Sequence, residues 1–108
     1  MPPKKKRLTT EAFSRFFASG RRFHSDHLQL IHTPNPVFHG AAVVGKKVYK
    51  TAVKRNRLRR QLYSALYAWH RAGDHNGVYI VVAKPAAANI SGRILSAELR
   101  ELVGRTHE

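Results

Sequence analysis

Five positive charges fall within seven residues of a segment that also has the apolar spacing of a helix. The stretch AVKRNRLRRQLYSALY, residues 52–67, carries them at Lys54, Arg55, Arg57, Arg59 and Arg60. Like charges three or four residues apart on a helix repel by about 0.2–0.5 kcal/mol per pair. Guanidinium groups bind phosphate oxygens in a bidentate manner, and Lys adds a point charge. The spacing therefore predicts a phosphate-binding surface, where a nucleic acid removes a repulsion that the free protein must bear.

The charge of the whole chain supports the same interpretation. It has 20 Lys and Arg against 6 Asp and Glu, which gives a formal net charge of +14 at pH 7. The interval between Asp26 and Asp74 contains no carboxylate but holds Lys46, Lys47 and Lys50 as well as the basic stretch. A solvated surface usually mixes both signs, whereas this pattern is typical of nucleic-acid binding.

Membrane insertion and secretion are not expected. No apolar run approaches the ~18 residues that a membrane span needs. The first ten residues have no apolar stretch behind their charges, as a secretory signal would, and cysteine is absent. We expect a cytoplasmic protein.

The residues that could support catalysis are few and scattered. The chain has six carboxylates, Glu11, Asp26, Asp74, Glu98, Glu101 and Glu108. Two-metal phosphodiester hydrolysis needs carboxylates in a cluster, and only Glu98 and Glu101 share helical spacing. We interpret those two as partners of Arg93, Arg100 and Arg105, and each of the seven histidines as a surface or strand-edge side chain. The sequence predicts neither a catalytic residue nor a metal site.

The elements that must position the basic residues follow from the periodicity of apolar side chains. Helices are expected at 9–20, 51–72 and 93–104, and strands at 27–32, once or twice within 37–48, and at 78–83. The last strand is apolar on both faces and should be central. The predicted order αβββαβα is an α+β fold, with residues 1–7 as a flexible basic arm and residues 8–108 as one RNA-binding domain.

The first predicted helix carries an aromatic stripe. Phe13, Phe16 and Phe17 recur at positions i, i+3 and i+4. Either all three are core residues, or one or two of them line a groove where unpaired bases stack, for about 1–3 kcal/mol per base. The sequence leaves both alternatives open.

The segment GKKVYKTAVKRNRLRRQLYSALY closely resembles the signature of the protein subunit of bacterial ribonuclease P. The matching positions are Lys46-Lys47, Ala52-Val53, Arg55-Asn56-Arg57, Leu58 and Arg59-Arg60. Residues 7–20, with Phe13 and Phe17, are similar to the first helix of that family, and YIVVAKPAA is similar to its last strand and the following loop. The resemblance covers roughly residues 7–103.

The resemblance implies a fold and a partner. The fold would be an αβββαβα sandwich with a central sheet and a left-handed βαβ crossover, as in the second domain of ribosomal protein S5. The partner would be the catalytic RNA of ribonuclease P, which with bound Mg²⁺ removes the 5′ leader of precursor tRNA. The protein would supply no catalytic group, and Mg²⁺ would be held mainly by the RNA.

The resemblance also implies two sets of site residues. The catalytic RNA would contact Lys46, Lys47, Lys50, Lys54, Arg55, Asn56, Arg57, Arg59 and Arg60. The leader would contact Phe13, Phe16, Phe17 and Ile31, the last of which corresponds roughly to a strand aromatic of some members. The alternative function is that of a small ribosomal or nucleoid-type protein that binds nucleic acid through phosphates only. Weak homodimerisation of the free protein is left open.

Overall fold

The predicted element order is confirmed. A computed structural model describes residues 9–73 and 75–106. Its elements are α1 (Thr10–Ser19), β1 (Arg21–His24), β2 (Leu28–Thr33), β3 (His39–Val43), α2 (Ala52–Gly73), β4 (Val78–Ala83), the short 3₁₀ helix η2 (Pro85–Ala87) and α3 (Gly92–Arg105). The predicted basic arm, residues 1–7, lies outside the described residues.

The four strands form one mixed sheet in the order β1-β2-β4-β3. β2 pairs antiparallel with both β1 and β4, while β3 and β4 are parallel neighbours. Because β3 and β4 run in the same direction, the chain must cross over between them, and α2 forms this crossover connection. The predicted central position of residues 78–83 is confirmed, whereas the left hand of the crossover stays a prediction.

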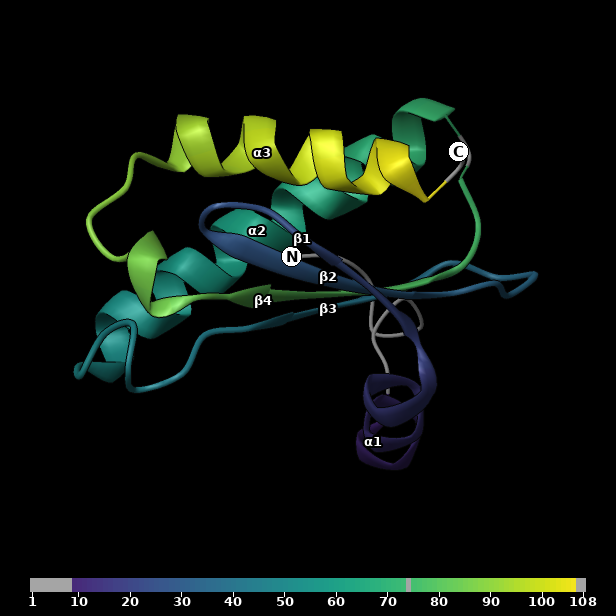
Figure 1. Ribbon diagram of the computed structural model, residues 1–108, viewed down its shortest axis with the longest axis horizontal. Coiled ribbons are helices and arrows are strands. Elements are labelled where there is room, and N and C mark those ends of the chain that lie inside the picture. The colour runs from purple at the N-terminus through teal and green to yellow at the C-terminus, as the bar shows by residue number, and fades with distance from the viewer. Residues whose placement is uncertain (1–8, 74, 107–108) are drawn as a thin grey trace.

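The helices lie on both faces of this sheet, with α2 and α3 on one face and α1 on the other (Figure 1). Alternate side chains of β4 serve the two faces, because successive residues of a strand point in opposite directions. Tyr79 and Val81 belong to the cluster under α2 and α3, and Val78 and Ile80 to the cluster under α1.

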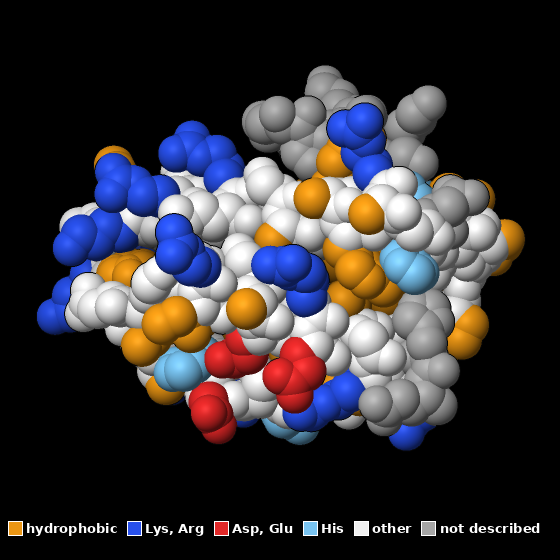
Figure 2. Space-filling model, turned by 90° about the horizontal axis from the view of Figure 1, so that it is seen from above, with side chains coloured by type: hydrophobic (Ala, Val, Ile, Leu, Met, Phe, Trp, Pro, Cys, Tyr) orange, Lys and Arg blue, Asp and Glu red, His pale blue; other side chains and the backbone are white. Residues whose placement is uncertain are grey.

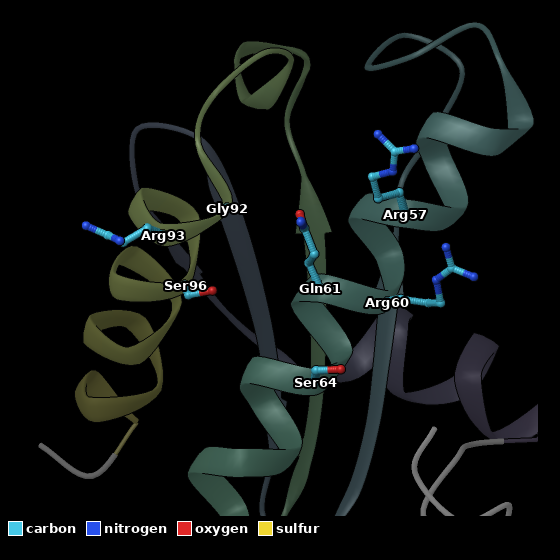
Figure 3. A pocket seen from close by; sticks show the side chains of 7 residues that line it. All are labelled: Arg57, Arg60, Gln61, Ser64, Gly92, Arg93 and Ser96. Carbon is cyan, nitrogen blue, oxygen red and sulfur yellow. The ribbon is translucent and has the colours of Figure 1, made fainter.

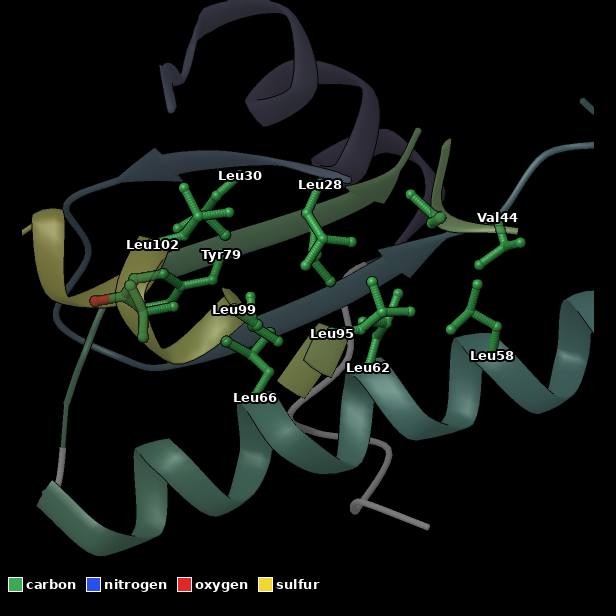
Figure 4. Packing of buried hydrophobic residues seen from close by; sticks show 14 of the residues in the cluster. Leu28, Leu30, Val44, Leu58, Leu62, Leu66, Tyr79, Leu95, Leu99 and Leu102 are labelled. Atoms are coloured by element: carbon green, nitrogen blue, oxygen red, sulfur yellow. The ribbon is translucent and has the colours of Figure 1, made fainter. Parts of the chain in front are cut away.

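The larger core holds α2 and α3 against the sheet (Figure 4). α2 contributes Leu58, Leu62 and Leu66, which recur every four residues and are at most 5% exposed. α3 contributes a second row of leucines to the same cluster, Leu95, Leu99 and Leu102. Full burial of such a side chain stabilises the fold by about 1.5–3 kcal/mol. This packing fixes which flank of α2 remains outside.

α1 lies one residue inside the predicted range 9–20 at each end, with Thr9 and Gly20 as its caps. The Thr9 hydroxyl accepts a hydrogen bond from the Ala12 N–H at 3.2 Å, and the Gly20 N–H donates to the Phe16 carbonyl at 2.9 Å. The N-terminal cap satisfies a donor that the first helical turn leaves free.

Two details of the fold differ from the prediction. β1 was not predicted, because it is a short edge strand of sequence RRFH in which only Phe23 packs against the core. Residues 37–48, where one or two strands were expected, contain one. α3 continues through Gly104 to Arg105, because Gly104 does not adopt the positive φ with which a glycine commonly ends a helix.

None of the helices in residues 9–73 and 75–106 combines the length and the apolar character that crossing a membrane requires.

Candidate nucleic-acid interface

The basic surface begins in the turn between β3 and α2. Lys46 and Lys47 are exposed, while Val44 and Val48 on either side of them are buried. The N–H groups of Val48 and Tyr49 both donate to the Gly45 carbonyl, at 3.1 and 3.4 Å. The two valines anchor the turn in the core, so both ammonium groups are held on its outer side.

The basic surface continues along the first turns of α2. Lys50, Lys54, Asn56, Arg57 and Arg60 are exposed, and Arg55 and Arg59 are half-buried. The first turn of α2 contains no acidic residue. A helix N-terminus already carries about half a positive charge from the aligned peptide dipoles. The start of α2 is therefore strongly electropositive, and an anion placed there would be stabilised by both contributions.

Two of the arginines also have partners inside the protein. Arg55 donates from one guanidinium nitrogen to the carbonyl oxygens of Tyr49 at 3.1 Å and Lys50 at 2.7 Å. Arg59 donates to the side-chain oxygen of Asn56, one turn earlier. Arg55 thus ties the basic turn to α2, which a phosphate-binding role does not require.

Carboxylates do not neutralise this surface. Within the described ranges, none of its nine residues forms an ion pair; Glu98 pairs with His27 and Glu101 with Arg105. Figure 2 shows Lys and Arg side chains gathered at the end of the molecule where α2 begins, and the Asp and Glu side chains grouped elsewhere on that face. The unrelieved repulsion inferred from the sequence is present in the fold.

The aromatic stripe of α1 lies on the opposite face of the sheet. Phe13, Phe16 and Phe17 are all half-buried against the cluster of Ile31, Val78 and Ile80. The rings of Phe13 and Phe17 stack at 5.6 Å between centroids, and the Arg22 guanidinium lies 5.0 Å from the centre of the Phe17 ring. The stripe therefore helps to hold α1 on the sheet while part of its ring surface stays accessible. This result is intermediate between the two alternatives, a fully buried stripe and a groove where bases stack.

Ile31 cannot serve as the expected leader contact. Its side chain is only 1% exposed and lies in the cluster beneath α1. It sits on the α1 face of β2, a central strand, so the helix covers it. The expectation of an accessible side chain at this position is wrong.

Glu98 has different partners from those predicted. Its carboxylate accepts hydrogen bonds from the Ser25 hydroxyl and from the His27 N–H at 2.9 Å, and it lies 2.7 Å from Nδ1 of the His27 ring. Burial raises the pKa of Glu98, but the hydrogen bonds from Ser25 and His27 outweigh it, so the pKa lies below its ordinary value. This carboxylate fastens the β1–β2 turn to α3, whereas the predicted Glu101–Arg105 pair is present at 3.2 Å.

His70 is buried rather than at the surface, which corrects the prediction made for all seven histidines. It is 8% exposed, and its ring stacks on Phe38 at 4.1 Å between centroids. Its Nδ1 lies 2.6 Å from the His75 carbonyl oxygen. It occupies the fourth position of the row formed by Leu58, Leu62 and Leu66, a signal that the spacing of four already contained.

In the described part of the chain, no three His, Asp or Glu side chains come close enough together to hold a metal ion.

A pocket between α2 and α3 brings together residues that the sequence did not connect (Figure 3). Its volume is about 560 Å³. Its lining consists of Arg57, Arg60, Gln61, Ser64, Gly92, Arg93 and Ser96. Only Arg57 and Arg60 were predicted as site residues. Gln61 and Ser64 lie on the same helix but carry no charge, and Gly92, Arg93 and Ser96 become their neighbours only because α3 packs beside α2.

Comparisons with known proteins agree on one family. The family model described as Ribonuclease P matches residues 1–107. The chain is 32% identical over 92 residues to the ribonuclease P protein component of Coprothermobacter proteolyticus, covering 83% of this chain and 74% of that protein. It is 32% identical over 100 residues to the same component of Vibrio cholerae, covering 91% and 80%.

Solved structures show the same fold. An RNase P protein mutant of Staphylococcus aureus superposes with a TM-score of 0.82 at 22% identity, covering 96% of this chain and 90% of that one. The RNase P protein of Thermotoga maritima gives 0.75 at 18% identity, covering 92% and 96%.

Proposed function

The chain belongs to the ribonuclease P protein family, and from this membership we propose that it is the RNA-binding subunit of a ribonucleoprotein endonuclease that removes the 5′ leader of precursor tRNA. The observation that carries the proposal is the carboxylate-free basic surface of the β3–α2 turn and the start of α2. Its partner is the ribonuclease P RNA. Lys46, Lys47, Lys50, Lys54, Asn56, Arg57, Arg59 and Arg60 contact RNA phosphates, and Arg55 shapes the turn and adds its charge.

Catalysis in this proposal belongs to the RNA. The chain would supply counter-charge and position, and the RNA would hold most of the Mg²⁺, whose chemistry when bound is the activation of water for phosphodiester hydrolysis. The donor set of the protein supports this division, since no three His, Asp or Glu side chains of residues 9–73 and 75–106 gather closely enough to hold a metal ion, and Glu98 is already engaged by Ser25 and His27. The protein would act in the cytoplasm, where its substrate is processed.

The leader of the precursor would lie along α1. Phe13, Phe16 and Phe17 keep ring surface accessible, and Arg15 and Arg22 lie 5.0 Å from the ring centres of Phe16 and Phe17. Aromatic faces flanked by guanidinium groups suit single-stranded RNA, because bases stack on the rings while the charges meet the backbone. The basic surface and the stripe lie on opposite faces of the sheet, so catalytic RNA and leader would not compete.

The test is leader-dependent affinity in the reconstituted holoenzyme. The protein is combined with a ribonuclease P RNA, and precursor tRNAs with leaders from zero to several nucleotides are titrated at near-physiological Mg²⁺. Affinity that increases with leader length only when the protein is present supports the proposal. Affinity that ignores the leader removes α1 from the proposal, and the absence of any gain in cleavage overturns it. Under the alternative function, a protein that binds phosphates alone would give equal affinity for precursor and mature tRNA.

A further inference from the structure

The pocket between α2 and α3 is one part of a longer groove. A second pocket of about 210 Å³ shares Arg57 and Gln61 with the first and adds Lys54 and Asn89 to the lining. The groove therefore runs from the start of α2, past the loop before α3, and along the first turns of α3. Its base is firm, because Leu58, Leu62, Leu95 and Leu99 beneath it belong to one buried cluster.

The chemistry of the groove is that of an anion site. Lys54, Arg57 and Arg60 come from α2 and Arg93 comes from α3, while Gln61, Ser64, Ser96 and Asn89 supply neutral hydrogen-bonding groups. Neither pocket is lined by a carboxylate, and in residues 9–73 and 75–106 none of the four cations forms an ion pair.

The side chains that line the groove point in different directions. Gln61 lies between the two helices, whereas the guanidinium groups of Arg60 and Arg93 point away from it on opposite sides (Figure 3). Arginine side chains are long and flexible, so both guanidinium groups can turn toward an anion bound beside Gln61.

We propose that this groove binds backbone phosphates of the ribonuclease P RNA, with Arg93 of α3 as a phosphate ligand beside Arg57 and Arg60. The inference rests on the proposed function and extends it, because the RNA would be held between two helices rather than lie on α2 alone. Phosphates are the favoured ligand because the groove is open, is lined by cationic and neutral hydrogen-bonding side chains, and is continuous with the basic surface. A strand that leaves the start of α2 along this flank meets Arg93 next.

The first test compares two arginines of α3. Arg93→Ala removes the groove residue, and Arg100→Ala removes an exposed arginine of the same helix outside the lining. Affinity for the ribonuclease P RNA is measured over a range of salt concentrations. Arg93→Ala should bind about tenfold more weakly, the loss expected for a charge-assisted hydrogen bond, with a salt slope reduced by about one. Arg100→Ala should stay within about twofold of the original protein.

A second pair adds a negative charge instead of removing a positive one. Ser96→Glu places a carboxylate in the groove, and Ala97→Glu places one on the exposed side of the same turn. Only Ser96→Glu should weaken binding well beyond the general effect of charge. Circular dichroism confirms that both variants are folded.

The third test locates the RNA directly. Because the chain has no cysteine, Ser96→Cys and Ala97→Cys can each carry a single tethered iron chelate that cleaves nearby RNA. Ser96→Cys should cut the ribonuclease P RNA strongly at one place with no precursor tRNA added. Cuts that require precursor tRNA, or that fall in it, overturn the assignment to the catalytic RNA.

The outcomes distinguish a failure of the groove assignment from a failure of the proposed function. Equal affinities of Arg93→Ala and Arg100→Ala, with normal binding of the original protein, overturn the groove and leave the proposed function intact. Failure of the original protein to bind the RNA overturns both.

Discussion

The guanidinium group of Arg55 donates a hydrogen bond to the backbone carbonyl of Lys50 at 2.7 Å. A residue that sequence alone assigns to RNA is thus also a structural clamp, which holds the basic turn against the start of α2. The Arg55 side chain thus contributes both positive charge and stability. Arg60 is exposed and, among the described residues, forms no such hydrogen bond, so it contributes charge alone.

Arg55→Ala and Arg60→Ala should therefore differ in stability while both weaken RNA binding. Arg55→Ala should lower the free energy of unfolding by about 1–2 kcal/mol, because it deletes two hydrogen bonds to carbonyls. Arg60→Ala should change it by less than about 0.5 kcal/mol. Denaturant unfolding measures the free energy of unfolding, and titration with the ribonuclease P RNA over a range of salt concentrations measures RNA affinity.

Arg71→Ala is the control for this pair, since Arg71 is exposed at the far end of the same helix. It should leave RNA affinity within about twofold. A loss as large as that of Arg60→Ala would mean that the RNA responds to net charge and not to the basic surface.

Phe17→Leu should weaken binding of the leader without unfolding α1. Leucine keeps most of the apolar contact with the cluster beneath the helix but removes the ring face. We expect leader-dependent affinity to fall by about 1–3 kcal/mol if a base stacks there, with RNA assembly unchanged. Affinities of leaderless and leader-bearing precursors give the difference.

Phe23→Leu is a matched control for Phe17→Leu. Phe23 is also half-buried and has an arginine, Arg21, at 5.0 Å from its ring centre, but it packs against the cluster on the other face of the sheet. It should not affect the leader. Equal effects of the two variants would remove the aromatic stripe from the leader site.

Ile31 should behave as a core residue. Ile31→Ala should lower the free energy of unfolding by about 2–5 kcal/mol, since a cavity forms under α1. The milder Ile31→Val should cost about 0.5–1.5 kcal/mol and leave leader-dependent affinity unchanged. A leader defect in folded Ile31→Val protein would contradict the burial that the structure shows.

Glu98 should make stability depend on pH in the acid range. Its pKa is lowered in the folded state, so its contribution is fully present above the unfolded value of about 4.3 and is lost as the pH falls through the folded value. Glu98→Gln should cost about 1–3 kcal/mol at neutral pH and flatten this part of the pH profile. Unfolding curves from neutral pH to about pH 3 measure both effects.

Glu101→Gln provides the comparison. Its side chain is 71% exposed and pairs with Arg105 one turn later, so the change should be less than about 1 kcal/mol. If both variants lose the same acid dependence, the cluster around Glu98 is not its origin.

Local patterns determined much of this protein. The apolar spacing of residues 51–72 and 93–104 and the doubly apolar strand at 78–83 depend on neighbours within a few residues. The strand is confirmed, and both helices are present with ends within one residue of the prediction. The family could be identified for the same reason, because its basic signature is one continuous segment. β1 was not predicted because an edge strand with one inward side chain carries almost no periodic signal.

Only the tertiary structure determined which side chains that are distant in the sequence contact each other. His27 and Glu98 are 71 residues apart, and Arg57 and Arg93 line one groove because α3 packs beside α2. Ile31 is buried because α1 covers that face of the sheet. Periodicity shows that a side chain faces inward or outward from its own element. It does not show which element lies opposite, because that depends on how two distant faces pack together.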